Sequence, residues 1–483
     1  MIRTRFAPSP TGYMHIGNLR TALYAYLYAR KQGGKFILRI EDTDRKRNVP
    51  QAIGVIYNSL SLAGIEYDEG PDKDGMFGPY MQSQRLETYK DHAVKLLEIG
   101  SAYPCFCSKG KIDQGKKNGV ERRDSCRYLD TKNVESKKRE GETFVIRQKI
   151  PDSGVTSFVD HVFGTITIAN TDLDDQVLLK SDGFPTYNFA NVVDDYLMHI
   201  THVIRGVEYL SSTPKYELLY DAFGWTSPEY VHLPHITKEN GRKLSKREGD
   251  ASFEDVVAKG YLPEAIVNYV SLLGWNPGND QEFFKIKELI QAFDIDKKNK
   301  SNAAFSFPKL DWLNSQHIRA LSLEQFQATA NHFYPLEISK KFDLTKISKM
   351  IQSRIARLTD IPEMVKFFSD LPNYHIQLFM HEKSKSTLAT SQMILKEIFP
   401  ILTSLEEWTH ERLQETLKVF ANETGIKVST VMWPFRIAIS GLEITPGGAT
   451  EIADILGKAE TMRRIVIAQQ ILNNYLSANH TQV

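Results

Sequence analysis

Residues 5–18, RFAPSPTGYMHIGN, join a strand, a loop and a helix, and this order indicates the fold class. Residues 2–6 form a short apolar strand, which the two prolines of the stretch prevent from continuing. Residues 19–31 carry apolar and aromatic side chains at helical spacing, and Gly33-Gly34 ends that helix. Residues 35–40 then predict a second strand. A β-α-β unit of this length indicates a parallel sheet with a right-handed crossover.

The loop of this unit has the properties of a phosphate site. Ligands of parallel sheets bind beyond the carboxyl ends of the strands, where residues 7–17 and 41–44 both lie. Gly17 has no side chain to block a nucleotide, and a helix N-terminus favours anions. His15 is placed to donate a hydrogen bond to negative charge developing on an α-phosphate. The alternative is a loop histidine whose hydrogen bonds are satisfied by nearby backbone.

The rest of the chain divides by its periodicity. From about residue 105 to residue 180 a looser, more charged sequence carries short β-like runs, at 143–150, 155–159 and 164–169. We interpret this stretch as an insertion in the parallel-sheet domain. Regular βα character returns at 177–180 and 199–205, and Ser212-Thr213-Pro214 predicts the N-cap and first turn of a helix ending at 222. Beyond 252 the periodic segments are helical: 263–273, 284–293, 323–333, 347–358, 392–405 and 411–423.

The composition is that of an ordinary globular chain. Its 483 residues are 41% hydrophobic and 25% charged, and this length predicts two to four packed units. Sixty Lys and Arg nearly balance 59 Asp and Glu, so only local basic faces are available to a nucleic acid. No apolar run approaches the roughly 20 residues of a membrane span, and three cysteines are too few for a disulfide framework. We expect a cytoplasmic monomer with no membrane partner.

A second motif, KENGRKLSKR at residues 238–247, lies in a polar stretch far downstream. A mobile loop bearing lysines can close over a triphosphate and neutralise the leaving pyrophosphate, although a solvated basic loop is the alternative. Together the two motifs resemble the ATP-binding signatures of class I aminoacyl-tRNA synthetases. The residues around them resemble the bacterial-type glutamyl-tRNA synthetases. The first motif departs from the family's usual His-Ile-Gly-His at Asn18, which offers only neutral hydrogen bonding.

The resemblance implies an ATP site occupied together with Mg²⁺. Catalysis would rest on His15, Lys243 and Lys246, of which Lys246 matches the second lysine of the family's loop. The residues that the resemblance assigns to ATP binding are Ala7, His15, Gly17, Glu208, Lys243, Lys246 and Arg247.

Free glutamate offers one ammonium and two carboxylates, so its pocket needs an acceptor and arginines. By resemblance, Arg5 and Arg205 bind the carboxylates and Glu41 binds the amine. Ser9, Tyr187 and Asn191 would add hydrogen bonds. A site built in this way rejects glutamine, because the neutral amide leaves an arginine unpaired.

The three cysteines fall in one window, as Cys105-Phe-Cys107 and then Cys126. This spacing resembles the zinc site that some glutamyl enzymes carry in the insertion. The family's fourth ligand is a histidine two residues after the third cysteine, where this chain has Tyr128. Asp124 or water could take its place, because structural zinc usually has four ligands. Three reduced thiols without metal are the alternative.

The resemblance also implies tRNA(Glu) as a partner. The insertion would hold the acceptor end, and Asp44 resembles a family position near the terminal adenosine. The C-terminal helices would read the anticodon. Arg354 matches the arginine by which discriminating glutamyl enzymes recognise the third anticodon base, whereas relatives that also charge glutamine tRNA have a neutral residue there. A solvated arginine on a helix face is the alternative.

The fold expected is α/β, a Rossmann-like catalytic domain with an inserted acceptor-binding subdomain, followed by an all-helical anticodon-binding region. The expected boundaries are 1–107 and 181–250 for the catalytic domain, 108–180 for the insertion, 251–322 for a helical stem-contact region, and 323–483 for the anticodon-binding domain.

The activity expected is that of a glutamate–tRNA ligase, which forms glutamyl-adenylate and transfers glutamate to the terminal adenosine of tRNA. A glutaminyl-tRNA synthetase would carry β-barrels in the tail, where strand periodicity is scarce. A short tRNA-modifying paralogue would lack the helical tail. A non-catalytic tRNA-binding module would be expected to lose His15 or the lysine loop. A small nucleotidyltransferase would explain the first motif but not the glutamate residues.

Overall fold

The computed structural model describes residues 1–44, 47, 49, 51–107, 125–242, 244 and 252–480. The chain divides into two compact units. The first consists of residues 1–258 and 263–310, and the second of residues 259–262 and 311–483. Among the described residues, no helix is long and apolar enough to cross a membrane.

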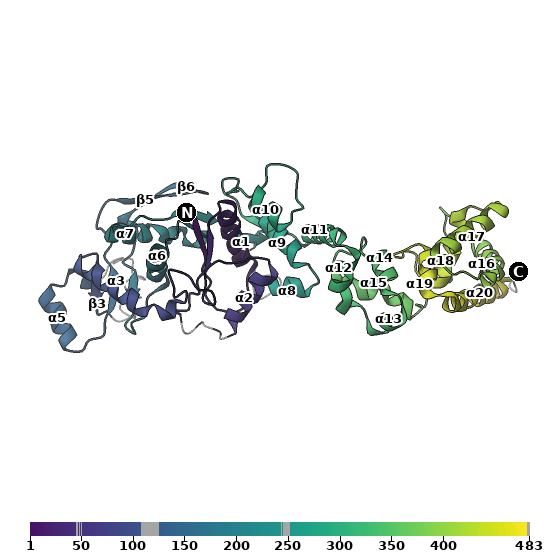
Figure 1. The fold of residues 1–483 in the computed structure, drawn as a ribbon, viewed down its shortest axis with the longest axis horizontal. Helices are drawn as coiled ribbons and strands as arrows, with labels where there is room; N and C mark the ends of the chain where they lie inside the picture. Colours follow the sequence, from purple (N-terminus) through teal and green to yellow (C-terminus); the bar gives the residue numbers. More distant parts are fainter. Residues whose placement is uncertain are drawn as a thin grey trace. The chain divides into compact units, whose positions relative to one another are not determined.

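The first unit is built on a six-stranded sheet with the strand order β2-β1-β8-β9-β5-β6. Figure 1 labels β5 and β6 of this sheet. Its strands are β1 (Arg3–Phe6), β2 (Lys35–Leu38), β5 (Val155–Asp160), β6 (Gly164–Ala169), β8 (His202–Gly206) and β9 (Glu229–Leu233). All neighbours are parallel except β5 and β6, which form a hairpin. The prediction of a parallel-sheet α/β domain is confirmed.

Two smaller sheets complete the strands of this unit. One is an antiparallel sheet of β3 (Ala102–Cys105), β4 (Val145–Gln148) and β7 (Val177–Leu179). The other pairs β10 (Ile236–Lys238) with β11 (Ala303–Phe305). Within residues 125–180, the hairpin β5-β6 belongs to the main sheet, whereas β4 and β7 belong to the small antiparallel sheet.

Helix α1 (Ile16–Lys31) begins directly after His15, helix α6 (Tyr187–Leu197) carries Tyr187 and Asn191, and both bury apolar side chains. Helices α3 (Leu86–Glu98), α6 and α7 (Thr213–Phe223) share a core with the small antiparallel sheet, through residues that include Tyr89, Leu178, Phe189 and Tyr216. The other helices that start in this unit are α2 (Ala52–Leu62), α5 (Thr131–Arg139), α8 (Phe253–Ala258), α9 (Pro263–Ser271), α10 (Ile286–Ala292) and α11 (Phe307–Ala320).

One local prediction at the start of α7 is wrong. Ser212 has a helical backbone (φ −90°, ψ −18°), and its side chain makes no capping hydrogen bond. The reason is that a 3₁₀ helix at Val207–Ser212 runs directly into α7, so the chain enters already coiled. The first-turn proline predicted at Pro214 is present.

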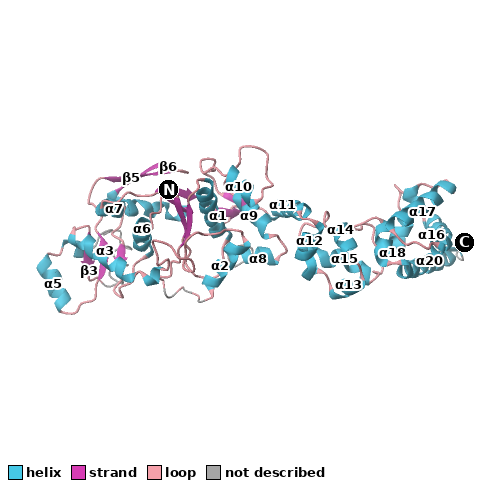
Figure 2. Cartoon of the chain, viewed as in Figure 1, coloured by secondary structure: helices cyan, strands magenta, loops and turns pink. Residues whose placement is uncertain are grey.

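The second unit contains helices and no strand among its described residues, as Figure 2 shows by the absence of magenta there. Its helices are α12 (Leu323–Ala330), α13 (Leu336–Lys341), α14 (Leu344–Ile351), α15 (Ile361–Ser369), α16 (Leu388–Ser404), α17 (His410–Glu423), α18 (Val428–Ser440), α19 (Ala449–Leu456) and α20 (Lys458–His480). The all-helical tail is confirmed. The single helix expected over 347–358 is wrong, because α14 ends at Ile351 and a turn follows.

Candidate active site

The first signature places His15 at the N-cap of α1. Its Nδ1 accepts a hydrogen bond from the backbone N–H of Gly17 at 3.0 Å, which satisfies one of the unpaired donors at the start of the helix. An accepting Nδ1 in a neutral imidazole puts the proton on Nε2, which is then a donor. The cap and the donor role are therefore compatible, because they use different ring nitrogens.

Gly17 is required by the position of this imidazole. A Cβ on Gly17 would lie 3.2 Å from Nδ1 of His15, closer than an ordinary van der Waals contact. Upstream, Gly12 has a φ of +124°, which L-residues with a side chain rarely adopt. The loop between strand and helix therefore needs both glycines, one for its backbone and one for the ring. Asn18 lies next to them with an exposed side chain.

Helix α6 presents three of the site's polar residues on one face, because Tyr187, Asn191 and Asp195 follow at a spacing of four. Asp195 accepts two hydrogen bonds from Arg5 of β1, at 3.1 and 3.2 Å, and one from Nη1 of Arg39 at 2.7 Å. Burial alone would raise the pKa of Asp195, but the two guanidiniums hold it below the usual value. Helix and sheet are thus fixed to each other by a buried charge cluster.

Glu41 lies inside the same cluster and is 3% exposed. Its Oε1 accepts from Nε and Nη2 of Arg39 at 3.3 and 3.0 Å, whereas its Oε2 has no hydrogen-bond partner among the described residues. Burial raises the pKa of Glu41 to about 7, although Arg39 and Arg5 act in the opposite direction. An acceptor left open in a buried site is suited to a donor that arrives with a ligand.

Arg205, at the carboxyl end of β8, is aimed by neighbours on both sides. Its Nε donates to Nε2 of His232 at 3.0 Å and its Nη2 donates to the Thr213 hydroxyl at 2.8 Å. His232 is held in turn by Asp160, whose Oδ2 lies 2.7 Å from Nδ1. The remaining nitrogen of Arg205, Nη1, makes no hydrogen bond to a described residue. The arginine therefore presents one corner of its guanidinium.

Tyr187 and Asn191 lie beside these charges. Burial raises the pKa of Tyr187 well above its usual value, and the charges that act on this phenol include Glu41 and Arg205. The Tyr187 ring stacks on Tyr209 with centroids 5.0 Å apart. Asn191 is buried and interacts with the Tyr216 hydroxyl. Its Nδ2 makes no hydrogen bond of good geometry to a described residue. The structure therefore brings together Arg5, Glu41, Tyr187, Asn191 and Arg205.

The other predicted residues occupy varied positions. Ala7 is half-buried in the loop after β1, and Ser9 and Asp44 are exposed. Glu208 is exposed, and its carboxylate folds back over Gly206, where a Cβ would lie 2.2 Å from Oε2. Lys243, Lys246 and Arg247 lie outside the described residues, as does Asp124.

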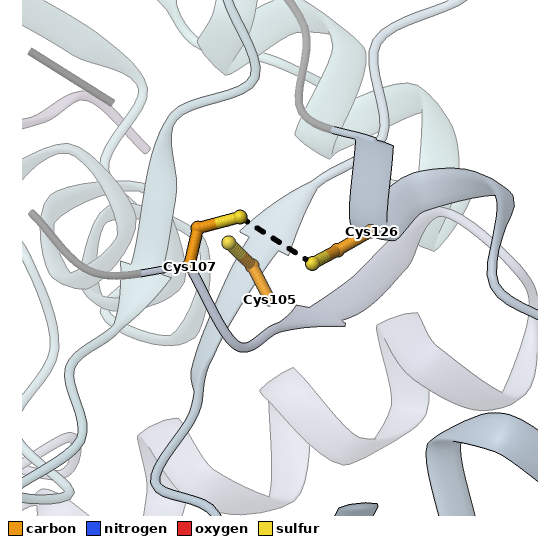
Figure 3. A group of neighbouring side chains, drawn as sticks. All are labelled: Cys105, Cys107 and Cys126. Carbon is orange, nitrogen blue, oxygen red and sulfur yellow. Dashed lines mark hydrogen bonds between the residues drawn. The ribbon is translucent and has the colours of Figure 1, made fainter. Parts of the chain in front are cut away.

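The three cysteines meet beside β3, with their ligand atoms all within 4.8 Å of one another (Figure 3). The Sγ atoms of Cys107 and Cys126 are 3.6 Å apart, and Cys105 is almost fully buried. Tyr128 is 71% exposed and the Arg127 guanidinium lies over its ring at 5.6 Å. The thiols fit a soft divalent ion, and Tyr128 as a fourth ligand stays a prediction.

Arg354 is exposed in the turn that follows α14 and not on a helix face, so a solvated arginine stays the alternative to its predicted role. Its backbone N–H donates to the carbonyl of Ile351 at 2.8 Å, which fixes the turn.

Several residues of the site were not found from the sequence: Arg39, Asp160, Asp195, Thr213 and His232. Two of them had a readable signal. Arg39 interrupts an apolar strand, and Asp195 continues the four-residue spacing of Tyr187 and Asn191. His232 and Asp160 had none, because their meeting depends on the parallel neighbours β5 and β9.

Comparisons with known proteins agree with this geometry. Residues 1–312 match the family model for tRNA synthetases class I (E and Q), catalytic domain. Residues 322–469 match the model for an anticodon binding domain. The chain belongs to the class I tRNA synthetases of the E and Q family.

Individual relatives share one name. The chain is 51% identical over 482 residues to the glutamate–tRNA ligase of Clostridium tetani, covering 99% of both. It is 51% identical over 473 residues to that of Clostridium acetobutylicum, covering 96% of this chain and 98% of the relative. A crystal structure of a glutamate tRNA ligase from Elizabethkingia meningosepticum, in complex with its amino acid, is 34% identical with a TM-score of 0.88, covering 98% and 99%.

Proposed function

We propose that this protein is a glutamate–tRNA ligase that activates glutamate with Mg-bound ATP and transfers it to tRNA(Glu). The observation that carries the proposal is the pair of open polar groups in one buried cluster. Nη1 of Arg205 and Oε2 of Glu41 both lack partners among the described residues, and they suit a carboxylate and an ammonium respectively. The family membership and the named relatives support the same activity.

In the first step, an oxygen of the glutamate α-carboxylate attacks the α-phosphorus of ATP, and the bond to the bridging oxygen of pyrophosphate breaks. No protein base is required, because the nucleophile is already an anion. Nε2–H of His15 donates to the charge that develops on the α-phosphate. Nε2 carries the proton because Nδ1 accepts from Gly17. Lys246 and Lys243, with Arg247, neutralise the leaving pyrophosphate, by resemblance to the family's loop.

In the second step, a ribose hydroxyl of the terminal adenosine attacks the glutamyl carbonyl and loses its proton. AMP leaves with the bonding electrons and takes up that proton. Asp44 is proposed to lie near that adenosine. Catalysis consists mainly of positioning and charge stabilisation, because both steps join groups that are bound next to each other.

Among the arginines, we propose Arg205 as the principal ligand of a substrate carboxylate. Arg5 donates both Nε and Nη2 to Asp195, so its fork is already paired. We propose that Arg5 acts mainly by holding Asp195 and the face of α6, while its charge favours a nearby carboxylate. Ser9, Tyr187 and Asn191 complete the amino-acid site, and Ala7, Gly17 and Glu208 the nucleotide site.

We also propose that the thiols of Cys105, Cys107 and Cys126 hold a structural zinc ion in the insertion. Three convergent sulfur atoms fit zinc, which would fix β3 against the segment containing Cys126. For tRNA choice, we propose Arg354 as the residue that favours glutamate tRNA over glutamine tRNA.

The experiment that tests the proposal is ATP–pyrophosphate exchange with glutamate and tRNA present, in wild type and in His15→Ala and Lys246→Ala. Both substitutions are expected to lower the exchange rate by roughly 100-fold or more, since each removes a donor to transition-state charge. Exchange at the wild-type rate in both variants would overturn the assignment.

A test of tRNA choice uses Arg354→Gln. The wild type is expected to charge glutamate tRNA and not glutamine tRNA, and the variant is expected to narrow that difference. Equal charging of the two tRNAs by the wild type would overturn the role of Arg354.

A further inference from the structure

A second set of metal-ligand atoms lies in the first unit, away from the thiols. His161, His202 and Glu229 bring their ligand atoms within 4.8 Å of one another. His202 and Glu229 are the first residues of the neighbouring parallel strands β8 and β9 and pair in register, so both lie at the amino edge of those strands. The residues proposed for glutamate lie at the opposite, carboxyl edge. His161 directly follows β5.

The hydrogen bonds of His202 prepare its Nε2 as a ligand. The Thr201 hydroxyl donates to the carbonyl of Arg3 at 3.1 Å and accepts from the N–H of Arg3 at 2.9 Å. Its oxygen therefore faces Nδ1 of His202, at 2.9 Å, as an acceptor, and the proton of a neutral imidazole sits on Nδ1. Nε2 then carries the lone pair, which accepts from the Tyr28 hydroxyl at 3.0 Å, so a metal ion bound at Nε2 would displace that hydroxyl. Metal-bound histidines are commonly oriented in this way through their other nitrogen.

His161 has a similar outer partner. Its Nε2 lies 2.7 Å from Oε2 of Glu229, and its Nδ1 lies 3.3 Å from Oδ1 of Asp296. Both ring nitrogens thus face carboxylate oxygens, one in the cluster and one outside it. Oδ1 of Asp296 is also 3.8 Å from the ammonium of Lys298, so the carboxylate interacts with both His161 and Lys298.

The spacing of the three atoms is near that of a tetrahedral site. Metal–nitrogen bonds of about 2.0–2.1 Å at tetrahedral angles separate two ligand atoms by about 3.3 Å. Nε2 of His202 and Oε2 of Glu229 are 3.4 Å apart already. His161 and Glu229 would have to separate by roughly half an ångström, and their side chains, 26% and 59% exposed, have room to do so.

We propose that His161, His202 and Glu229 bind a divalent ion of the zinc class. Two imidazoles and one carboxylate are a donor set that zinc and cobalt accept, and water would supply the fourth position. The ion would join the three neighbouring strands β8, β9 and β5. The pairing between β5 and β9 that the ion would reinforce is short, because these strands pair in register only at Asp160 and Tyr230. Its role is therefore to secure the hairpin β5-β6 to the sheet.

The test is titration of the metal-free full chain with Co²⁺, carried out on the Cys105→Ser/Cys107→Ser variant so that the thiol cluster no longer contributes. The proposal expects one equivalent of Co²⁺ with visible d–d absorption and no thiolate charge-transfer band. Glu229→Gln and His161→Ala on this background should each weaken binding by at least about tenfold. Matched controls, Glu66→Gln and His332→Ala, replace an exposed carboxylate and an exposed histidine elsewhere and should leave binding unchanged.

Failure of the cysteine variant to bind Co²⁺ would overturn the proposal, as would binding that survives both cluster substitutions. If the cysteine variant does not fold, the same question is answered in the wild-type background. There His161→Ala should remove the d–d absorption of the cobalt bound without thiolates and leave any sulfur-to-cobalt band intact. A cobalt spectrum unchanged by His161→Ala would overturn the proposal. As a second readout, Zn²⁺ should slow amide hydrogen exchange at residues 155–160, and unchanged exchange there would contradict the role in holding β5.

Discussion

Arg205 donates from Nε to Nε2 of His232 at 3.0 Å, and this contact, together with the hydrogen bond to Thr213, sets the direction of the guanidinium in the candidate site. His232 can accept only while it is neutral, with its proton on Nδ1 facing Asp160 at 2.7 Å. Burial lowers the pKa of His232 to about 4, and the positive charge of Arg205 acts in the same direction. The imidazole is therefore a fixed acceptor at neutral pH, and the arginine keeps one corner for a ligand.

Replacing Arg205 by lysine should separate the contribution of the guanidinium's hydrogen-bond geometry to glutamate binding from the contribution of its positive charge. Lysine keeps one positive charge but cannot bond His232, Thr213 and a carboxylate at once. We expect Arg205→Lys to lower kcat/KM for glutamate by roughly 100-fold, with little change in KM for ATP. Steady-state charging measures both constants. An equal loss for ATP and glutamate would indicate a general structural effect, and Arg463→Lys, at a partly exposed ion pair outside the site, is the matched control.

His232 should make stability fall as the pH is lowered. Its pKa in the folded protein is about 4, below the ordinary 6.5, so the unfolded chain takes up a proton that the folded chain refuses. This contribution is fully present above pH 6.5 and is lost as the pH falls toward 4. Between about pH 7 and about pH 5 the loss amounts to about 2 kcal/mol. Urea unfolding of wild type and His232→Gln at both pH values should show a smaller pH effect in the variant, and parallel curves would refute this.

Glu41 should make the affinity for glutamate fall as the pH is lowered. Its pKa of about 7 means that the carboxylate needed by a substrate ammonium is partly protonated at neutral pH. The affinity for glutamate is expected to drop roughly tenfold between about pH 8 and about pH 6. Glu41→Gln should bind weakly and without this dependence. Calorimetry in two buffers of different protonation enthalpy would also detect proton release on binding, and its absence in the wild type would contradict the pKa argument.

Gly17→Ala should affect rate and stability differently. Alanine favours a helix by about 1 kcal/mol over glycine, so the folded state loses nothing from propensity. The new Cβ, however, would lie 3.2 Å from Nδ1 of His15 and would push the imidazole. We expect a lower kcat for pyrophosphate exchange with KM for ATP and the melting temperature nearly unchanged. A variant with full kcat would show that His15 is not held by this contact.

The sequence was most informative where local chemistry is dense. The strand-loop-helix at residues 2–31 could be predicted because prolines, glycines and helical spacing lie within thirty residues. The resemblance then supplied Glu41, Tyr187, Asn191 and Arg205, which the structure brings together with Arg5. What it did not supply is that Arg5 is paired with Asp195, because both partners come from elements 190 residues apart.

Longer-range features were harder to predict for the same physical reason. We predicted the hairpin β5-β6 as part of the insertion, because the alternation of exposed and buried residues along β5 is a local pattern. The pairing of β5 with β9 is a long-range contact, which that pattern does not show. The prediction of one helix over 347–358 was wrong, because apolar residues at 355 and 358 continue the helical spacing after α14 has ended. In both cases tertiary packing overrode a local pattern.

We propose that the open corner of Arg205 selects glutamate by its carboxylate, while the open oxygen of Glu41 holds the ammonium that glutamine also has. Purified glutamate tRNA can be charged with radiolabelled glutamate and, separately, with radiolabelled glutamine. We expect glutamyl-tRNA with the first amino acid and at least about 100-fold slower charging with the second. Comparable charging with glutamine, or none with glutamate, would contradict this proposal.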